Sequence, residues 1–288
     1  MTRIALTPSE DKALKALIAW WEDAGLELDE PVVRPRKTAA RPRAVTETAT
    51  QPFDDPIRPV SPRTAPVRAA TPAAAKAAGF GDRGASGPSS REIAADCKSL
   101  EELHTAIEAF DGCALKRTAR NTVFARGNPE TKIMIVGEAP GRDEDEQGKP
   151  FVGRSGQLLD RMFQSIGLGP DDLYISNIVN WRPPGNRNPT QEEIAVCLPL
   201  IERHIALKAP DILILTGGVS AQSLLRVASG ITRIRGQWHD YALRDATGEP
   251  GDQTVRAMPL FHPSYLLRRP AEKRLAWADL LTLRDALV

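Results

Sequence analysis

"KIMIVGEAPGRDEDEQGKPFVG", residues 132–153, is the stretch of the chain that decides its fold. An apolar run at 132–136 predicts a buried strand, and the Gly-Glu-Ala-Pro-Gly turn after it ends that strand abruptly. Further apolar runs at 173–179, 211–216 and 256–261 are separated by helical patterns around 155–166, 190–207 and 218–228. Alternating strands and helices indicate a mostly parallel sheet with helices on both faces. We therefore expect an α/β fold with three layers, α/β/α, around a mostly parallel four-stranded central sheet.

The first ninety residues differ in composition from the rest of the chain. Within 1–29, Thr7 and Glu10 form a capping box for an amphipathic helix over 7–25. We expect its apolar stripe to dock on the chain's own domain or on a second copy, with a separate protein partner as the alternative. Residues 30–90 are rich in Pro, Ala and Arg and predict a disordered linker. The predicted folded domain is 91–288.

Composition narrows the class of protein further. The 288 residues carry a formal net charge of +1, which by itself neither favours nor excludes a nucleic-acid partner. Three cysteines cannot form a closed set of disulfides, and no apolar run is long enough to span a membrane. With no apolar signal segment in view, we expect a cytoplasmic, reduced and monomeric protein.

Polar and aromatic side chains follow three of the predicted strands. Glu138 comes after the first strand, Asn177 ends the second and His262 follows the last. Ligands of such sheets bind beyond the carboxyl ends of the strands, so these side chains should share one crevice. Asn offers a donor and an acceptor together, which suits a planar imide edge such as that of uracil, and Phe151 could stack on that plane. Phosphates could be held by arginines in the nearby loops, namely Arg182, Arg187, Arg235, Arg268 and Arg269.

Four stretches of the chain carry a family resemblance. "VGEAPGRDEDEQGKPFVGRSGQLLDRM", "YISNIVNWRPPGNRNPTQEEI", "RIRGQW" and "HPSYLLRRP" closely resemble the uracil-DNA glycosylase superfamily, specifically its family-4 enzymes, over about residues 100–288. The resemblance implies a uracil-DNA glycosylase-like catalytic domain. Such a domain flips uracil out of DNA and hydrolyses its N-glycosidic bond, leaving an abasic site for base-excision repair.

The resemblance also implies a role for each motif residue. The loop from Gly137 to Gly141, which includes Ala139, would approach the extruded nucleoside and activate water, and Phe151 would stack on uracil. Asn177 would read the polar edge of the base, and His262 would face the carbonyl that gains charge as the bond breaks. Leu266 matches the wedge that fills the space vacated by the base. Because some branches carry Asp where Ala139 stands, we assign the water-orienting role to Glu138 and Glu144 jointly, and expect Asp143, Asp145 and Glu146 to form a solvated acidic turn.

The chain departs from the family at the metal centre. Family-4 members typically hold a four-iron, four-sulfur cluster with four cysteines, and only Cys113 and Cys197 match those positions here. Phe110 and Trp181 stand at the other two, and Cys97 lies too far upstream to replace them. We therefore predict that no cluster binds, that aromatic and apolar groups fill its space, and that the two matching cysteines are buried apolar side chains.

Two other functions remain open at this stage. A chain that lost catalysis along with its cluster would bind uracil-containing or abasic DNA without turnover. A nucleotide-binding or hydrolase protein is the second alternative, although the loop lacks both the G-x-x-x-x-G-K-[ST] and the G-x-G-x-x-G spacing.

The covalent branch of the superfamily uses a histidine in an inserted basic loop. "SGITRIRGQWHDY" has none before Gly236, so covalent trapping is not expected. We expect His239 to be a surface or strand histidine, and His104 and His204 to be structural.

Overall fold

The computed structural model describes residues 15, 18, 88–245 and 247–287. Of the helix predicted at 7–25, only Lys15 and Ile18 are described, and both are helical. The rest of segment 1–29 and nearly all of the predicted linker at 30–90 lie outside the described residues. The domain begins at helix α2 (Ser90–Asp96), which Ser89 and Glu92 cap reciprocally.

Among the residues that the structure describes, one sheet of six strands forms the centre of the domain, in the order β1-β3-β2-β4-β6-β5. The four inner strands are parallel: β3 (Tyr174–Asn177), β2 (Ile133–Gly137), β4 (Ile212–Thr216) and β6 (Pro250–Leu260). They are the four strands that the sequence predicts. The edge strands β1 (Arg126–Gly127) and β5 (His239–Arg244) are antiparallel to their neighbours and correct the predicted number. Sequence reasoning missed them because β1 has two residues and β5 has no continuous apolar run.

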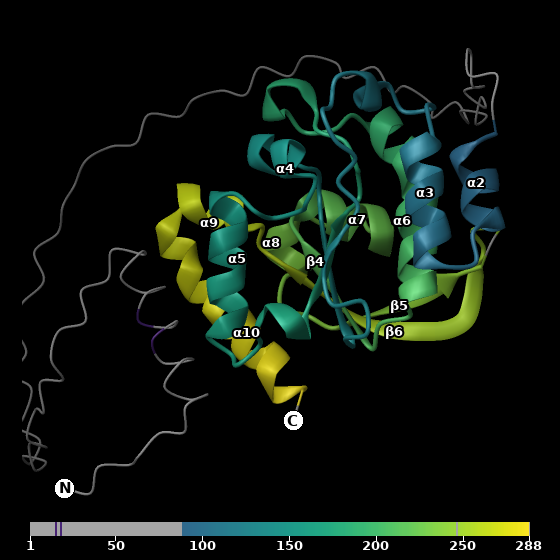
Figure 1. Ribbon diagram of the computed structural model, residues 1–288. Coiled ribbons are helices and arrows are strands. Elements are labelled where there is room, and N and C mark those ends of the chain that lie inside the picture. The colour runs from purple at the N-terminus through teal and green to yellow at the C-terminus, as the bar shows by residue number, and fades with distance from the viewer. Residues whose placement is uncertain (1–14, 16–17, 19–87, 246, 288) are drawn as a thin grey trace, which may run out of the picture. The chain divides into compact units, whose positions relative to one another are not determined.

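Helices cover both faces of the sheet (Figure 1). One face carries α5 (Arg154–Gln164), α9 (Pro263–Arg268) and α10 (Lys273–Asp285). The other carries α2, α3 (Leu100–Ala109), α6 (Gln191–Lys208) and α7 (Gly218–Leu225). Short helices lie in the loops: α4 (Arg142–Gln147), α8 (Ile231–Ile234), η1 (Ala114–Arg117), η2 (Pro170–Asp172), η3 (Pro184–Asn186) and η4 (Pro270–Glu272). Within the described residues, no helix combines the length and apolar character that crossing a membrane requires.

The inner strands are buried on both sides, which explains their continuous apolar sequences. In β2, Met134 and Val136 pack toward α6, whereas Ile133 and Ile135 pack toward α5. Successive side chains of a strand point to opposite faces, so a strand between two helical layers needs apolar residues at every position. This double burial confirms the predicted three-layer α/β/α class.

The order of the strands places a crevice beyond the end of β2. The next strand along the chain, β3, lies on one side of β2, and β4 lies on the other. Ligands of open α/β sheets bind where the strand order reverses in this way. In the register of the two strands, Gly137 at the end of β2 lies opposite Asn177 at the end of β3. The inner strands thus bring the predicted site residues to one edge.

Candidate active site

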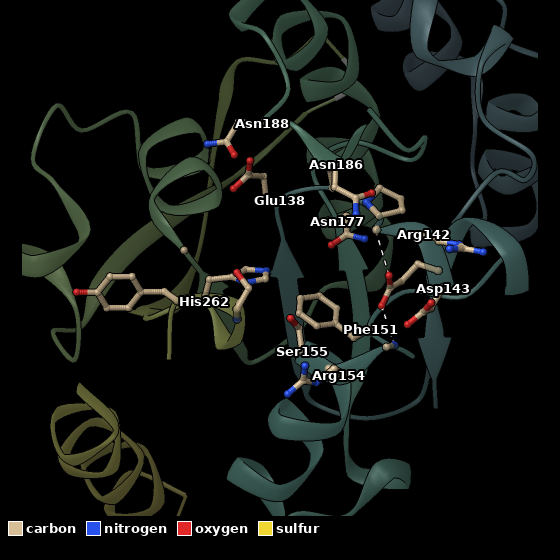
Figure 2. A pocket seen from close by; sticks show the side chains of 18 of the residues that line it. Glu138, Arg142, Asp143, Phe151, Arg154, Ser155, Asn177, Asn186, Asn188 and His262 are labelled. Carbon is tan, nitrogen blue, oxygen red and sulfur yellow. Dashed lines mark hydrogen bonds between the residues drawn. The ribbon is translucent and has the colours of Figure 1, made fainter. Parts of the chain in front are cut away.

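A cavity of about 640 Å³ opens at this edge of the sheet. Its walls come from the loops after all four inner strands, and they include Glu138, Phe151, Asn177, Gly217 and His262. Figure 2 shows the side chains of Phe151, Asn177 and His262 facing a common space, with Glu138 at its edge. The carboxylate, amide, imidazole and aromatic ring predicted to converge therefore do so.

Asn177 and Phe151 meet over Gly137, a residue without a side chain. A Cβ atom at Gly137 would lie 2.4 Å from Asn177 Oδ1 and 2.5 Å from Phe151 Cζ. Asn177 is buried at the end of β3, and none of the described residues forms a hydrogen bond with its side-chain amide. Because Asn177 lines the cavity, its amide can form hydrogen bonds with a polar ligand there. Phe151 is held with a positive φ of 54° and is itself buried.

His262 caps helix α9 and is neutral. Its Nδ1 accepts a hydrogen bond from the backbone N–H of Ser264 at 3.1 Å and lies 2.8 Å from Ser264 Oγ. Burial, and then the charge of Arg268, lower the pKa of His262 to about 4. Because Nδ1 accepts, the single proton of the neutral ring resides on Nε2. The ring lies 5.6 Å from that of Phe151, so a donor N–H stands beside the stacking surface.

Gly217 lets His262 reach the site, and sequence reasoning did not single it out. It follows β4 and precedes α7 with a φ of +97°, and a Cβ atom there would lie 3.2 Å from His262 Cβ. A larger residue would be strained in this conformation and would push the imidazole away. The signal that could have revealed it is the Gly217-Gly218 pair directly after an apolar run.

Glu138 and Glu144, which the sequence groups together, differ in their surroundings. Glu138 is half-buried, and burial alone raises the pKa of its carboxyl. Glu144 instead accepts backbone N–H groups with both oxygens, from Gly141 at 3.1 Å, Val152 at 3.0 Å and Gly153 at 2.9 Å. Glu144 thus joins the start of α4 to the loop that carries Phe151, whereas Glu138 keeps its carboxylate available to the cavity.

The acidic turn is not solvated throughout, which corrects the expectation for Asp145. This residue is 6% exposed, and its Oδ1 accepts the backbone N–H groups of Arg120 at 2.8 Å and Asn121 at 3.2 Å. Asp143 and Glu146 are exposed, as expected. The buried carboxylate therefore ties the 120–121 segment to α4.

The predicted phosphate-binding arginines fall into different surroundings. Arg268 is exposed at the rim of the cavity. Arg187 also lines it, but forms a two-pronged ion pair with Glu193. Arg182 donates to Asn186 Oδ1 at 2.6 Å in the adjoining loop. Arg235 departs from the prediction, because its Nε donates to Asp279 Oδ2 at 2.8 Å and its guanidinium packs over Phe261, so its donors are already used within the domain.

Leu266, which matches the family's wedge, is fully buried. It packs in the apolar core on the α5 side of the sheet, at 0% exposure. Its neighbour Tyr265 is half-buried and lines the cavity from the same short helix. In this conformation Leu266 supports the core, and the side of α9 that faces the cavity carries Tyr265 and Arg268.

Sequence reasoning missed several residues of the rim. Arg142 and Arg154 are exposed at the first positions of α4 and α5. Further polar rim residues are Ser155, Asn186 and Asn188. They were missed because a helix start and an irregular loop give no periodic pattern. Their position next to predicted site residues was the one signal available.

The four positions of the family's cluster pattern lie in one buried apolar cluster. Cys113 and Cys197 are 1% and 0% exposed, and their Sγ atoms are 3.9 Å apart. The rings of Phe110 and Trp181 lie 6.3 Å apart in the same cluster. The described part of the chain groups no three His, Cys, Asp or Glu side chains as metal ligands. The residues present therefore do not fit a cluster held by four thiolates, while the predicted burial of both cysteines is confirmed.

Comparison with known proteins places the chain in a family. The family model of the uracil DNA glycosylase superfamily matches residues 124–281, and the chain belongs to this superfamily. The type-4 uracil-DNA glycosylase of Pyrobaculum aerophilum is 36% identical over 176 residues, which are 60% of this chain and 86% of that protein. The type-4 enzymes of Archaeoglobus fulgidus and Thermotoga maritima are also 36% identical, over 60% and 59% of this chain and 85% and 83% of their own lengths. The resemblance seen in the motifs is thereby confirmed.

Proposed function

We propose that this chain is a uracil-DNA glycosylase that hydrolyses the N-glycosidic bond of uracil in DNA and leaves an abasic site. One observation carries the proposal: a buried amide, an aromatic ring and a neutral imidazole donor face one cavity at the end of the sheet. Its relatives are named for the same activity. The cavity lies within the 300–1,000 Å³ or so that small-molecule sites span.

Recognition of the base falls to Asn177 and Phe151. The Asn177 amide can donate to a uracil carbonyl and accept from the ring N3–H, while the buried Phe151 ring supports the plane of the base. Cytosine has an amine in place of one carbonyl and no N3–H, so it would leave the amide mispaired. We expect uracil to be excised and normal cytosine to be left intact.

Bond cleavage is assisted from two sides of the cavity. As the C1′–N1 bond breaks, its electron pair passes to the uracil ring, and the Nε2–H of His262 stabilises the carbonyl oxygen that gains charge. A water molecule adds to C1′ and loses a proton, which Glu138 is placed to accept. Burial raises the pKa of Glu138 and so makes this carboxylate a stronger base. Glu144 acts through the backbone, by holding the loops that carry Phe151 and Gly141.

DNA would lie across the rim of the cavity. Arg142, Arg154 and Arg268 are exposed there and can contact the phosphates that flank the extruded nucleotide. Arg182 donates a hydrogen bond to Asn186, which lines the cavity. These contacts carry no information about sequence, so we expect affinity to depend on salt and excision to depend on the base.

The test is excision of uracil from a labelled oligonucleotide, single- and double-stranded, in the presence of EDTA. Wild type should cleave, and Asn177→Ala should lose most of the activity while remaining folded by circular dichroism. Thr105→Ala, a change on the exposed surface of α3, serves as the matched control and should leave excision unchanged. No cleavage by folded wild type, combined with retained binding of uracil-containing DNA, would replace this proposal with that of a non-catalytic binder.

A further inference from the structure

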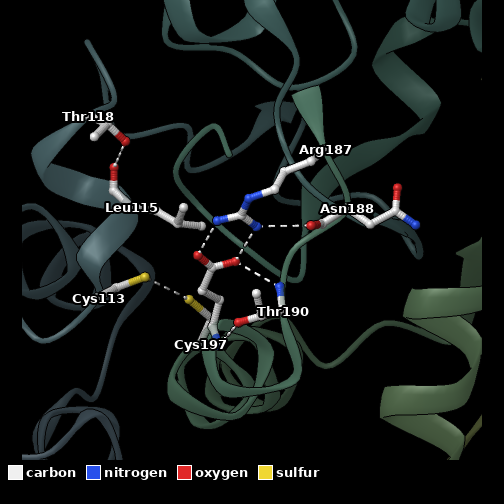
Figure 3. A network of polar contacts seen from close by, with 8 residues as sticks. Cys113, Leu115, Thr118, Arg187, Asn188, Thr190 and Cys197 are labelled. Atoms are coloured by element: carbon white, nitrogen blue, oxygen red, sulfur yellow. Dashed lines mark hydrogen bonds and ion pairs between the residues drawn. The ribbon is translucent and has the colours of Figure 1, made fainter. Parts of the chain in front are cut away.

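The sulfur atoms of Cys113 and Cys197 are in van der Waals contact within the domain (Figure 3). Cys113 stands at the start of η1, and Cys197 lies in α6, 84 positions further along the chain. Their separation of 3.9 Å exceeds an S–S bond of about 2.05 Å by roughly 2 Å, so the two sulfur atoms must approach each other further for a bond to form. Among the described side chains, no third cysteine, histidine or acid joins them to form a metal-ligand group.

We propose that Cys113 and Cys197 form a reversible disulfide when the protein meets a small oxidant such as a hydroperoxide. The bond would link the η1 segment to α6 at the two cysteine positions that this chain shares with the family's cluster pattern. Cys97 would not take part, because its Sγ donates to the carbonyl of Ile93 within α2.

The chemistry balances with a hydroperoxide as the oxidant. The thiolate of Cys113 attacks one peroxide oxygen, the O–O bond breaks, and a sulfenic acid forms as the first water or alcohol leaves. The sulfur of Cys197 then attacks the sulfur of Cys113, the S–O bond breaks, and a water leaves with the remaining protons. The two thiols lose two electrons and two protons, and the peroxide takes up both. A dithiol such as dithiothreitol reverses the reaction by exchange.

The cross-link would secure the part of α6 whose Glu193 holds a loop at the rim of the cavity. Glu193 lies one helical turn before Cys197 and accepts hydrogen bonds from the guanidinium of Arg187 at 2.7 and 2.8 Å. Arg187 also donates to the carbonyl of Asn188 at 3.0 Å, and both residues line the cavity. Neither cysteine lines the cavity, so we expect the reduced and oxidised proteins both to excise uracil. The disulfide proposal thus stands or falls independently of the proposed function.

The experiment compares the full chain reduced with dithiothreitol and then oxidised with hydrogen peroxide. Oxidation should lower the intact mass by two hydrogens and reduce the number of titratable thiols in denaturant from three to one. A non-reducing peptide map should join the peptides of Cys113 and Cys197. The melting temperature should rise by roughly 5–10 °C, because the cross-link restricts a long loop in the unfolded chain, and dithiothreitol should reverse the rise.

Variants separate this pair from the third cysteine. Cys97→Ser should keep the mass change and the thermal shift, whereas Cys197→Ser should lose both. Should Cys197→Ser fail to fold, the reversible shift of wild type together with its peptide map still decides the matter. Three free thiols after oxidation, a link that includes Cys97, or an oxidised form that melts below the reduced one would overturn the proposal.

Discussion

The imidazole of His262 can donate a hydrogen bond because the fold keeps it neutral. A backbone N–H occupies Nδ1 and burial opposes a positive charge, so the ring presents Nε2–H to the cavity over the whole physiological range. A protonated ring would carry a charge that the enclosed site would have to solvate. At the scale of the residue, burial thus keeps the ring neutral, and one backbone donor fixes its tautomer.

His262 should titrate with a midpoint near pH 4, well below its ordinary value of 6.5. The unfolded chain binds a proton at His262 below about pH 6.5, whereas the folded protein does so only near pH 4. The free energy of unfolding is therefore highest above pH 6.5 and decreases as the pH falls toward 4. Nitrogen-15 NMR of the imidazole checks the midpoint and the tautomer. His262→Ala should lower single-turnover excision by about 100- to 1,000-fold, as loss of an oxyanion donor does elsewhere. A midpoint near 6.5 would contradict this account.

The loop that carries Phe151 depends on a single carboxylate at the start of α4. Glu144 accepts three backbone N–H groups, and a Gln side chain could accept through one atom only. At the scale of the element, two carboxylates of the acidic run after β2 connect segments of the chain, Glu144 to the loop of Phe151 and Asp145 to residues 120–121, while Asp143 and Glu146 are exposed.

Glu144→Gln and Glu138→Gln should weaken excision in different ways. Glu144→Gln should lower the melting temperature and cut excision by up to about 100-fold, since the stacking loop is displaced. Glu138→Gln should cut excision without lowering the melting temperature, because it removes a half-buried charge that has no partner among the described residues. Thermal melts beside single-turnover kinetics distinguish the two. Equal stability losses would show that these carboxylates share one role.

Leu266 of helix α9 is buried in the apolar core. Leu266→Ala should therefore lower the free energy of unfolding by about 2–5 kcal/mol, as expected for a large-to-small change in a packed core. Its effect on excision, measured well below the melting temperature, should be similar for single- and double-stranded substrates. The partly exposed Leu267→Ala is the matched control and should cost less stability. A loss confined to double-stranded DNA, with stability intact, would restore Leu266 as the wedge.

At the scale of the molecule, the apolar cluster beneath α6 contains aromatic rings at two positions to which the sequence resemblance would assign cluster cysteines. Phe110 and Trp181 are 6% and 1% exposed, so they are part of the packed core on that side of the sheet. A domain with such a core can be held together by apolar burial in this region.

The protein should contain no iron–sulfur cluster. Protein purified without oxygen should be colourless, lack absorbance near 400 nm and retain excision after treatment with a chelator. Iron analysis by mass spectrometry provides the count. Stoichiometric iron and sulfide in a brown preparation would refute the prediction and require ligands beyond the two described thiols.

The sequence by itself determined the α/β class, the four inner strands and the residues at their ends. A strand buried on both faces needs a continuous apolar run, and the end of that run marks the end of the strand. The motifs determined the family, which the comparisons confirm. Only the tertiary structure decided that Glu144 connects to the loop of Phe151, that Asp145 and Leu266 are buried and that Arg235 is paired with Asp279. These outcomes depend on contacts between residues that are far apart in the sequence, and no local sequence pattern predicts such contacts.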